Sequence, residues 1–114
     1  MIAVIFEVWP RSGKAEEYLA IAADMRPLLD SIDGFISIER FTSISDPAKY
    51  LSLSFWRDEE AVAEWRSQLE HRDAQRRGRS EIFADYRLRI AAVARDYGLS
   101  ERDQAPADSR AIHD

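Results

Sequence analysis

Hydrophobic and polar positions follow two different periods along this chain. Residues 1–9 are apolar at nearly every position and rich in β-branched and aromatic side chains, with Glu7 as the one charge among them. A strand of this kind must be covered on both faces. From residue 14 onward, apolar side chains recur at intervals of three and four as far as Ile32, which predicts an amphipathic helix. Gly34 follows this helix at a position that suits a left-handed turn.

Two more strands, a second helix and a fourth strand follow. Residues 35–41 and 50–56 have strand character, and the polar connection between them contains Pro47, so we expect a hairpin. Acidic residues at 58–60 mark the start of a helix, because negative charge is favourable at a helix N-terminus. Alternation resumes at residues 86–93, which predicts the fourth strand.

The apolar stripe of the second helix stops early. Val62, Trp65 and Leu69 stand at helical spacing, but the next positions of their stripe are charged. A more polar stripe that begins at His71 and includes Gln75 takes its place. We therefore predict a break or rotation of the helix between residues 69 and 71, which would turn Trp65 and His71 toward the sheet together.

The predicted element order is β-α-β-β-α-β, which is the ferredoxin-like arrangement of an α+β domain with a four-stranded antiparallel sheet. Two helices can cover only one face of such a sheet, and its other face still carries large apolar side chains. A partner sheet has to cover that face, so we expect a homodimer. We assign residues 1–96 to this ferredoxin-like domain and residues 97–114 to a polar C-terminal extension.

Composition narrows the classes of function. The chain has 114 residues, enough for one domain, and a formal net charge of −5. It contains neither Cys nor Asn, and the absence of Cys excludes disulfides, thiolate nucleophiles and Cys-ligated metal centres. Its two histidines, His71 and His113, lie far apart in the sequence, so we expect no metal site. Residues 65–98 carry eight basic and five acidic side chains, a pattern too mixed for nucleic-acid binding but compatible with a small anionic ligand.

The sequence carries no signal for a membrane. No uncharged apolar run approaches the roughly 20 residues of a membrane-spanning helix, and the N-terminus does not resemble a secretory leader. We therefore expect a cytoplasmic protein that binds neither membranes nor nucleic acids. Its expected partners are a second copy of the chain and a small aromatic or anionic ligand.

The second helix holds the candidate catalytic residues, His71 and Trp65. An imidazole exchanges protons near neutral pH, an indole can wall a cavity that excludes water, and Gln75 one turn further can fix the imidazole tautomer. Gln75 is also one of the candidate substrate-binding residues, and the others are Trp56, Phe55, Arg79 and Tyr86. Trp65 and Trp56 have a structural alternative as core residues, and His71 has one as a helix cap.

Several segments stand in a recognisable order: the run 55–61, Trp65, residues 71–75 and the strand at 86–90. Together they resemble the antibiotic biosynthesis monooxygenase family, and the resemblance covers about residues 1–96. It implies a ferredoxin-like subunit of a dimeric α+β barrel, with a ligand cleft between the sheet and the helices. Members of this family include oxygenases that convert polyketide phenols to quinones without metal, flavin or haem, and other relatives degrade haem.

The missing Asn bears on the reaction that this resemblance implies. Haem-degrading relatives use an Asn, a Trp and a His, whereas this chain has no Asn and has Glu7 near the corresponding strand position. The resemblance therefore disfavours haem degradation and implies a monooxygenase without a cofactor, acting on a small aromatic, polyketide-like phenol with His71 as the base. Two alternatives stay open: a non-catalytic dimer that sequesters or senses a small molecule, and a domain whose own side chains fill the cleft. The last alternative predicts that there is no pocket.

Overall fold

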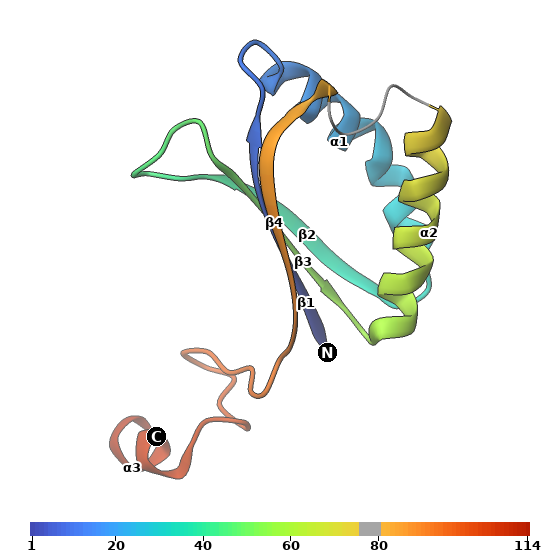
Figure 1. Cartoon of the computed structure of the whole chain (residues 1–114). Coiled ribbons are helices and arrows are strands. Elements are labelled where there is room, and N and C mark those ends of the chain that lie inside the picture. Colours follow the sequence, from blue (N-terminus) through green and yellow to red (C-terminus); the bar gives the residue numbers. More distant parts are fainter. Residues whose placement is uncertain (76–80) are drawn as a thin grey trace.

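The computed structural model describes residues 1–75 and 81–114, and it describes side chains at residues 1–70 and 81–114 (Figure 1). The helices and strands are β1 (Ile2–Pro10), α1 (Ala15–Asp30), β2 (Phe35–Thr42), β3 (Tyr50–Trp56), α2 (Glu59–Gln75), β4 (Phe83–Ala92) and α3 (Ala107–His113). The first six elements confirm the predicted β-α-β-β-α-β order, and β3 has the predicted bounds.

All four strands belong to one antiparallel sheet with the order β2-β3-β1-β4. Helices α1 and α2 both lie against the same face of this sheet, and no described helix covers the opposite face (Figure 1). This is the ferredoxin-like α+β subunit that the sequence predicts. Because successive side chains of a strand point to opposite faces, the even-numbered positions of β1 and β3 face the helices and the odd-numbered positions face away.

Strand β4 begins three residues earlier than the sequence predicts. Phe83 pairs with Pro10 beyond a bulge between Trp9 and Pro10. The ring of Phe83 meets the rings of Phe6 and Tyr18 edge-on, at centroid distances of 5.8 Å and 5.7 Å. These aromatic contacts extend the strand past the start of the apolar alternation, and no local pattern in the sequence marks them.

Helix α2 is continuous, so the break predicted between residues 69 and 71 is wrong. Asp58 caps its N-terminus, because the Asp58 Oδ1 accepts a hydrogen bond of 2.9 Å from the backbone N–H of Ala61. The backbone hydrogen bonds of a helix are local and need no apolar stripe, so α2 continues through charged positions to Gln75. At 3.6 residues per turn, Trp65 and His71 lie about 120° apart around the helix axis.

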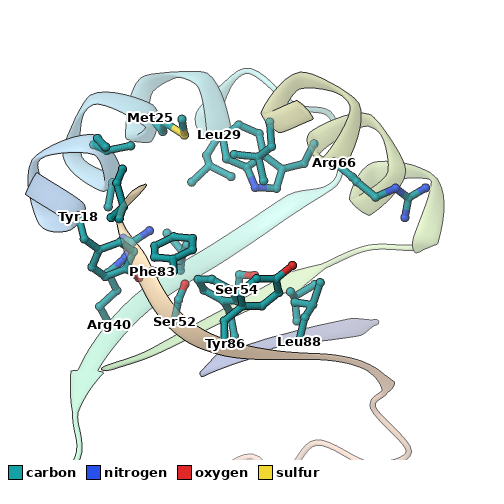
Figure 2. Close-up of a pocket in the computed structure, with 18 of the residues that line it drawn as sticks. Tyr18, Met25, Leu29, Arg40, Ser52, Ser54, Arg66, Phe83, Tyr86 and Leu88 are labelled. Carbon is teal, nitrogen blue, oxygen red and sulfur yellow. The ribbon is translucent and has the colours of Figure 1, made fainter. Parts of the chain in front are cut away.

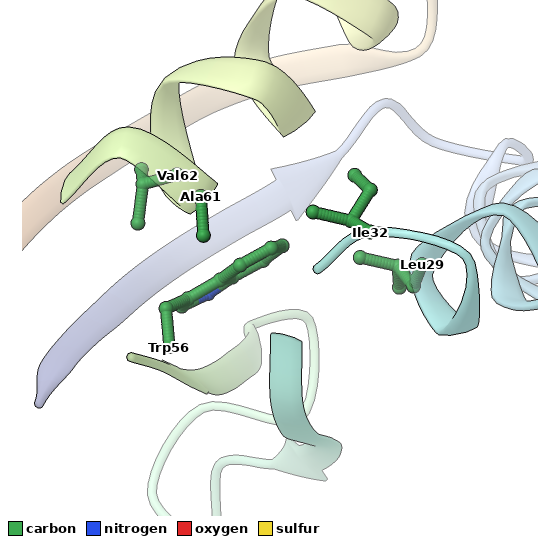
Figure 3. Packing of buried hydrophobic residues seen from close by; sticks show 5 residues of the cluster. All are labelled: Leu29, Ile32, Trp56, Ala61 and Val62. Atoms are coloured by element: carbon green, nitrogen blue, oxygen red, sulfur yellow. The ribbon is translucent and has the colours of Figure 1, made fainter. Parts of the chain in front are cut away.

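The core lies where the end of β3 meets the end of α1 and the start of α2 (Figure 3). It consists of the buried residues Leu29, Ile32, Trp56, Ala61 and Val62. The indole of Trp56 is fully buried, and its Nε1 donates a hydrogen bond of 2.9 Å to the Ser54 Oγ. The ring of Phe35 meets this indole edge-on at a centroid distance of 5.2 Å. The cluster joins the sheet to both helices at one end of the domain.

Polar contacts reinforce the same end of the domain. The backbone N–H of Arg57 donates to the carbonyl of Gly34 at 2.7 Å, and the Arg57 guanidinium pairs with Asp33 at 3.0 Å and with Asp58 at 3.1 Å. The hydrogen bond from Arg57 lowers the pKa of the Asp33 carboxyl, and the N–H of Ala61 contributes most to the lowered pKa of Asp58. These exposed ion pairs link the segment after α1 to the start of α2, although solvent screens them.

Replacing Gly34 with alanine should lower the free energy of unfolding by about 2–4 kcal/mol. Gly34 confirms the predicted left-handed turn with a φ of +95°, which other residues rarely adopt. A Cβ at this position would also lie 2.9 Å from the Cβ of Ala61, which is closer than van der Waals contact allows. Urea-induced unfolding of the variant measures the loss.

Gly13→Ala is the matched control for this substitution. Gly13 also has a positive φ, +79°, but no atom lies within 4 Å of the position that a Cβ would take. Gly13→Ala should therefore show only the backbone strain, about 1–2 kcal/mol. Equal losses in the two variants would contradict a contribution from the close approach of Ala61.

The sheet face turned away from the helices, here called the open face, carries a patch of apolar side chains. The patch consists of Ile5, Phe41, Leu51, Leu53 and Phe55, all half-buried or exposed. Glu7 lies on the same face and forms ion pairs with Lys49 at 3.4 Å and with Arg89 at 3.3 Å. An exposed apolar patch with a polar surround is typical of an interaction surface.

The residues after β4 lead away from the sheet and end in α3 (Figure 1). Arg102 holds this segment together, because its guanidinium donates hydrogen bonds to the carbonyl of Gly98 at 3.0 Å and to the Ser109 Oγ at 2.7 Å, and it pairs with Asp114. The domain boundary at residue 96 stays a prediction. Within the described ranges, none of the helices combines the length and hydropathy that crossing a bilayer requires.

Candidate functional site

A cavity of about 550 Å³ lies between the sheet and the two helices that cover it (Figure 2). Helices α1 and α2 form its roof, and the helix-facing side chains of all four strands form its floor. The largely apolar lining includes Phe6, Tyr18, Met25, Leu29, Trp65, Leu69, Tyr86 and Leu88. The described side chains therefore do not fill the cleft, whereas the alternative in which the protein's own side chains fill it predicts no pocket.

Two periodicities in the sequence produce this lining. On α1, Tyr18, Met25 and Leu29 recur at helical spacing and are buried on the side facing the sheet. On β3, alternation brings Ser52 and Ser54 to the floor of the cavity. Two small side chains in this strand leave space that larger apolar ones would fill in a close-packed core. The cavity thus depends on serine at the helix-facing positions of β3.

Polar groups on the floor are few and buried. Ser52 and Ser54 are 7% and 4% exposed, and the Ser54 hydroxyl accepts the hydrogen bond from Trp56 Nε1. Arg40 stands opposite Ser52 in the pairing of β2 with β3. The side chain of Arg40 lines the cavity, and its Nε is buried without a hydrogen-bond partner among the described residues.

The other charged side chains of the lining are exposed. They are Glu17, Arg66, Glu70 and Glu81. Glu17 forms an ion pair with Lys14 at 3.1 Å. In the described part of the chain, no three side chains of His, Asp or Glu gather closely enough to hold a metal ion. The described lining therefore offers hydrogen-bond donors and apolar contacts to a ligand.

Four aromatic rings form a contiguous part of the wall. The centroid of Phe6 lies 5.6 Å from that of Tyr86, and the centroid of Phe83 lies 6.0 Å from that of Tyr86 and 5.7 Å from that of Tyr18. Edge and tilted contacts of this kind hold the rings in place. A planar ring compound in the cavity would find preorganised aromatic surface here.

Trp65 and Tyr86 are the two sequence-predicted site residues that the described lining includes. Trp56 is instead in the core, where it is fully buried beside the start of α2. Phe55 lies on the open face, because it differs by one position from Ser54 and therefore points away from the cavity. We leave Trp56 and Phe55 out of the candidate site.

The remaining predicted site residues fall outside the described side chains. His71 and Gln75 belong to the last turns of α2, directly after Leu69 and Glu70, which line the cavity. The side chains of His71 and Gln75 are not among those described, and Arg79 lies outside the described residues.

The sequence reasoning missed the polar floor of the cavity. Ser52 and Ser54 lie on the same side of β3 as Trp56, and Arg40 lies on the same side of β2 as Ile38. This alternation could have identified them from the sequence, because a polar residue on the helix-facing side of a strand must lie in a core or in a cavity.

Comparisons with known proteins fit this geometry. The sequence profile of the family described as "Antibiotic biosynthesis monooxygenase" matches residues 1–77. The chain is 47% identical over 93 residues to jasmonate monooxygenase ABM of Pyricularia oryzae, which covers 82% of the chain and 43% of that protein. The chain spans less than two thirds of the length of the curated relatives it matches.

Solved structures share the fold at low sequence identity. Rv0793 of Mycobacterium tuberculosis is 21% identical with a TM-score of 0.71, over 85% of this chain and 98% of that one. The heme-degrader MhuD of the same organism, solved with two hemes bound in its active site, is 16% identical with a TM-score of 0.68, over 86% of this chain and all of that one (100%). With the profile match and the 47% identical relative, the chain belongs to the antibiotic biosynthesis monooxygenase family.

Proposed function

We propose that this protein is a monooxygenase that binds a small, largely apolar ring compound between its sheet and its helices. The cavity carries this proposal, because it offers about 550 Å³ of mostly apolar space with an aromatic wall. A cavity of this kind suits a small organic ligand and keeps water from its reactive atoms. Membership of the family and the monooxygenase name of the 47% identical relative support the reaction class.

The substrate class that we favour is an electron-rich phenol or an anthrone-like aromatic. A base removes a proton from the hydroxyl of the phenol or from the ring CH₂ group of the anthrone, the ring carbon that gains negative charge reacts with O₂, and loss of water leaves a carbonyl group. The substrate then supplies all the electrons that reduce O₂, one oxygen atom enters the product, and the other leaves as water. We assign the role of base to His71, and Gln75 would fix its tautomer. Trp65 and Tyr86 would wall the substrate, and Arg79 would face the developing negative charge.

The name of the 47% identical relative favours a second substrate class, jasmonate, which is a small cyclic carboxylate. Inserting one oxygen atom into a saturated C–H bond consumes two electrons that such a substrate does not supply. This class therefore needs an external reductant in the assay, whereas the phenol class does not. Oxygen uptake that depends on an added reductant would therefore indicate the jasmonate class, and uptake without a reductant would indicate the phenol class.

Haem degradation is not the reaction that we propose. The chain contains no Asn, the residue that the haem-degrading relatives use together with a Trp and a His. Glu7, near the corresponding strand position, lies on the open face and pairs with Lys49 and Arg89. When the protein is titrated with haem, we expect the Soret band to stay at the wavelength of free haem. A shift of this band that saturates at a fixed ratio of haem to protein would contradict this.

We also propose that two copies of the chain pack through their open faces. The apolar patch on that face is the observation in favour, because water contacts it in a single chain. Light scattering should therefore give twice the chain mass, and Leu53→Lys, which puts a charge into the patch, should give the mass of one chain. Leu19→Lys, at an exposed position of α1 on the other side of the sheet (Figure 1), is the control and should leave the mass doubled. Monomeric wild-type protein would contradict the proposal.

Oxygen uptake tests the proposed reaction. The purified protein is offered anthrones, naphthols and jasmonate, the last with and without ascorbate, and products are analysed after exposure to ¹⁸O₂. Oxygen uptake that leaves one ¹⁸O atom in the product supports the proposal. Ser52→Phe, which fills the floor of the cavity, should abolish this uptake. Saturable quenching of tryptophan fluorescence without uptake would indicate a protein that sequesters or senses its ligand instead.

A further inference from the structure

Arg40 is a cation of the cavity for which the described residues supply no counter-ion. It extends from β2 into the cavity, where it is half-buried. Among the described residues it forms no ion pair, and its Nε is buried without a hydrogen-bond partner. By contrast, Arg57 and Arg89 each pair with a carboxylate within 3.3 Å.

A buried guanidinium nitrogen without a partner is unfavourable, because it loses water without gaining a hydrogen bond. The cost is recovered when an anion accepts its N–H groups, since charge-assisted hydrogen bonds are strong where water is excluded. The planar fork of an arginine matches the two oxygens of a carboxylate and can bind both at once. The unpartnered Nε thus points to a missing acceptor inside the cavity.

The surroundings of Arg40 supply the rest of such a site. Ser52 stands opposite it on β3 and adds a hydroxyl donor, and Figure 2 shows Arg40 and Tyr18 toward the same side of the cavity. The carboxylates that line the cavity, Glu17, Glu70 and Glu81, are exposed and form no ion pair with Arg40 in the described structure. Among the described residues, none of these carboxylates therefore neutralises Arg40, which leaves room for an anionic ligand.

We propose that Arg40 and Ser52 bind a carboxylate group of the ligand, so that the ligand is an apolar ring compound carrying a carboxylate side arm. The ring then lies against the aromatic wall of Phe6, Phe83 and Tyr86, and the carboxylate lies at the Tyr18 end. The inference rests on the proposed function in one respect, namely that this cavity is the substrate site.

The test compares 1-naphthylacetate with 1-naphthylacetamide, which has the same shape and no charge. By titration calorimetry at neutral pH, the wild-type protein should bind the acid about tenfold or more tightly than the amide. Arg40→Met should remove this preference and leave the affinity for the amide within about twofold, because methionine keeps the apolar stem. Arg66→Met, at the other arginine of the described lining, is the matched control and should keep the preference.

A second measurement separates binding from a structural role. An arginine whose partner is a ligand contributes little to the stability of the ligand-free protein. The Arg40→Met variant should therefore unfold at the same temperature as the wild type or at a higher one. A lower melting temperature with unchanged ligand preference would overturn the proposal. Equal affinities for acid and amide in the wild type, or binding of neither, would overturn it too. Failure of the proposed oxygenation appears separately, as no oxygen uptake with any substrate while the preference for the acid persists.

Discussion

Replacing Trp56 with alanine should lower the free energy of unfolding by about 3–5 kcal/mol, the largest loss of stability that we expect from one substitution in this chain. The indole is fully buried, and side chains from α1, α2 and the segment between α1 and β2 surround it. Its removal leaves a cavity in the core and deprives the Ser54 hydroxyl of the hydrogen bond from Nε1. Denaturant unfolding followed by circular dichroism measures the change.

Trp9→Ala is the matched control for this prediction. Trp9 is half-buried, donates a hydrogen bond of 2.9 Å to Asp46, and lies under the Lys49 ammonium at 5.0 Å from the ring centroid. Its loss should cost about 1–2 kcal/mol, because solvent already reaches one side of the ring. Equal losses at the two tryptophans would mean that Trp56 is no more important to the core than a surface residue.

His71→Ala should lower kcat for oxygen uptake by about 10²–10⁴-fold, if the proposed function holds and His71 is the base. In the sequence, His71 follows Leu69 and Glu70, which line the cavity, but the continuous helix sets position 71 about 120° from Trp65, so this variant tests the assignment directly. Steady-state oxygen-electrode kinetics measure the loss of kcat.

Two variants control this experiment. His113→Ala removes the other histidine, which lies in α3 outside the cavity lining, and should leave kcat unchanged. Glu70→Gln removes a competing base, the carboxylate that lines the cavity next to His71 in the sequence. Unchanged kcat in His71→Ala together with a large loss in Glu70→Gln would assign the base to Glu70 instead.

The fold could be predicted from the sequence because its helices and strands follow from the local periodicity of hydrophobic residues. The alternation at residues 50–56 gave a strand with the observed bounds, and the spacing of Tyr18, Met25 and Leu29 gave the buried side of α1. The start of β4 was missed because Phe83 is held by rings that are distant in the sequence. The break in α2 was wrong because an interrupted stripe was taken as an interrupted helix.

The candidate site was harder to predict, because a cavity forms where the packed helices and strands leave space that no side chain fills. Trp56 and Ser54 share one face of β3, yet one lies in the core and the other on the cavity floor. The difference arises from where the ends of α1 and α2 approach the sheet, which no local pattern encodes. Trp65 was identified from its helical spacing and Tyr86 from its place near a strand end, whereas Arg40 was missed although it occupies a helix-facing position of β2.

Strand β1 lies at the centre of the sheet, with β3 on one side and β4 on the other. Its residues Val4 and Phe6 belong to the cavity floor, and Ile5 and Glu7 belong to the open face. Inserting or deleting one residue in β1 would exchange these two sets, because side chains alternate with a period of two. Glu7 would then enter the apolar cavity. The cavity floor and the open face together therefore fix the length of β1. The connection between β2 and β3, by contrast, can change in length without exchanging the side chains of these two surfaces.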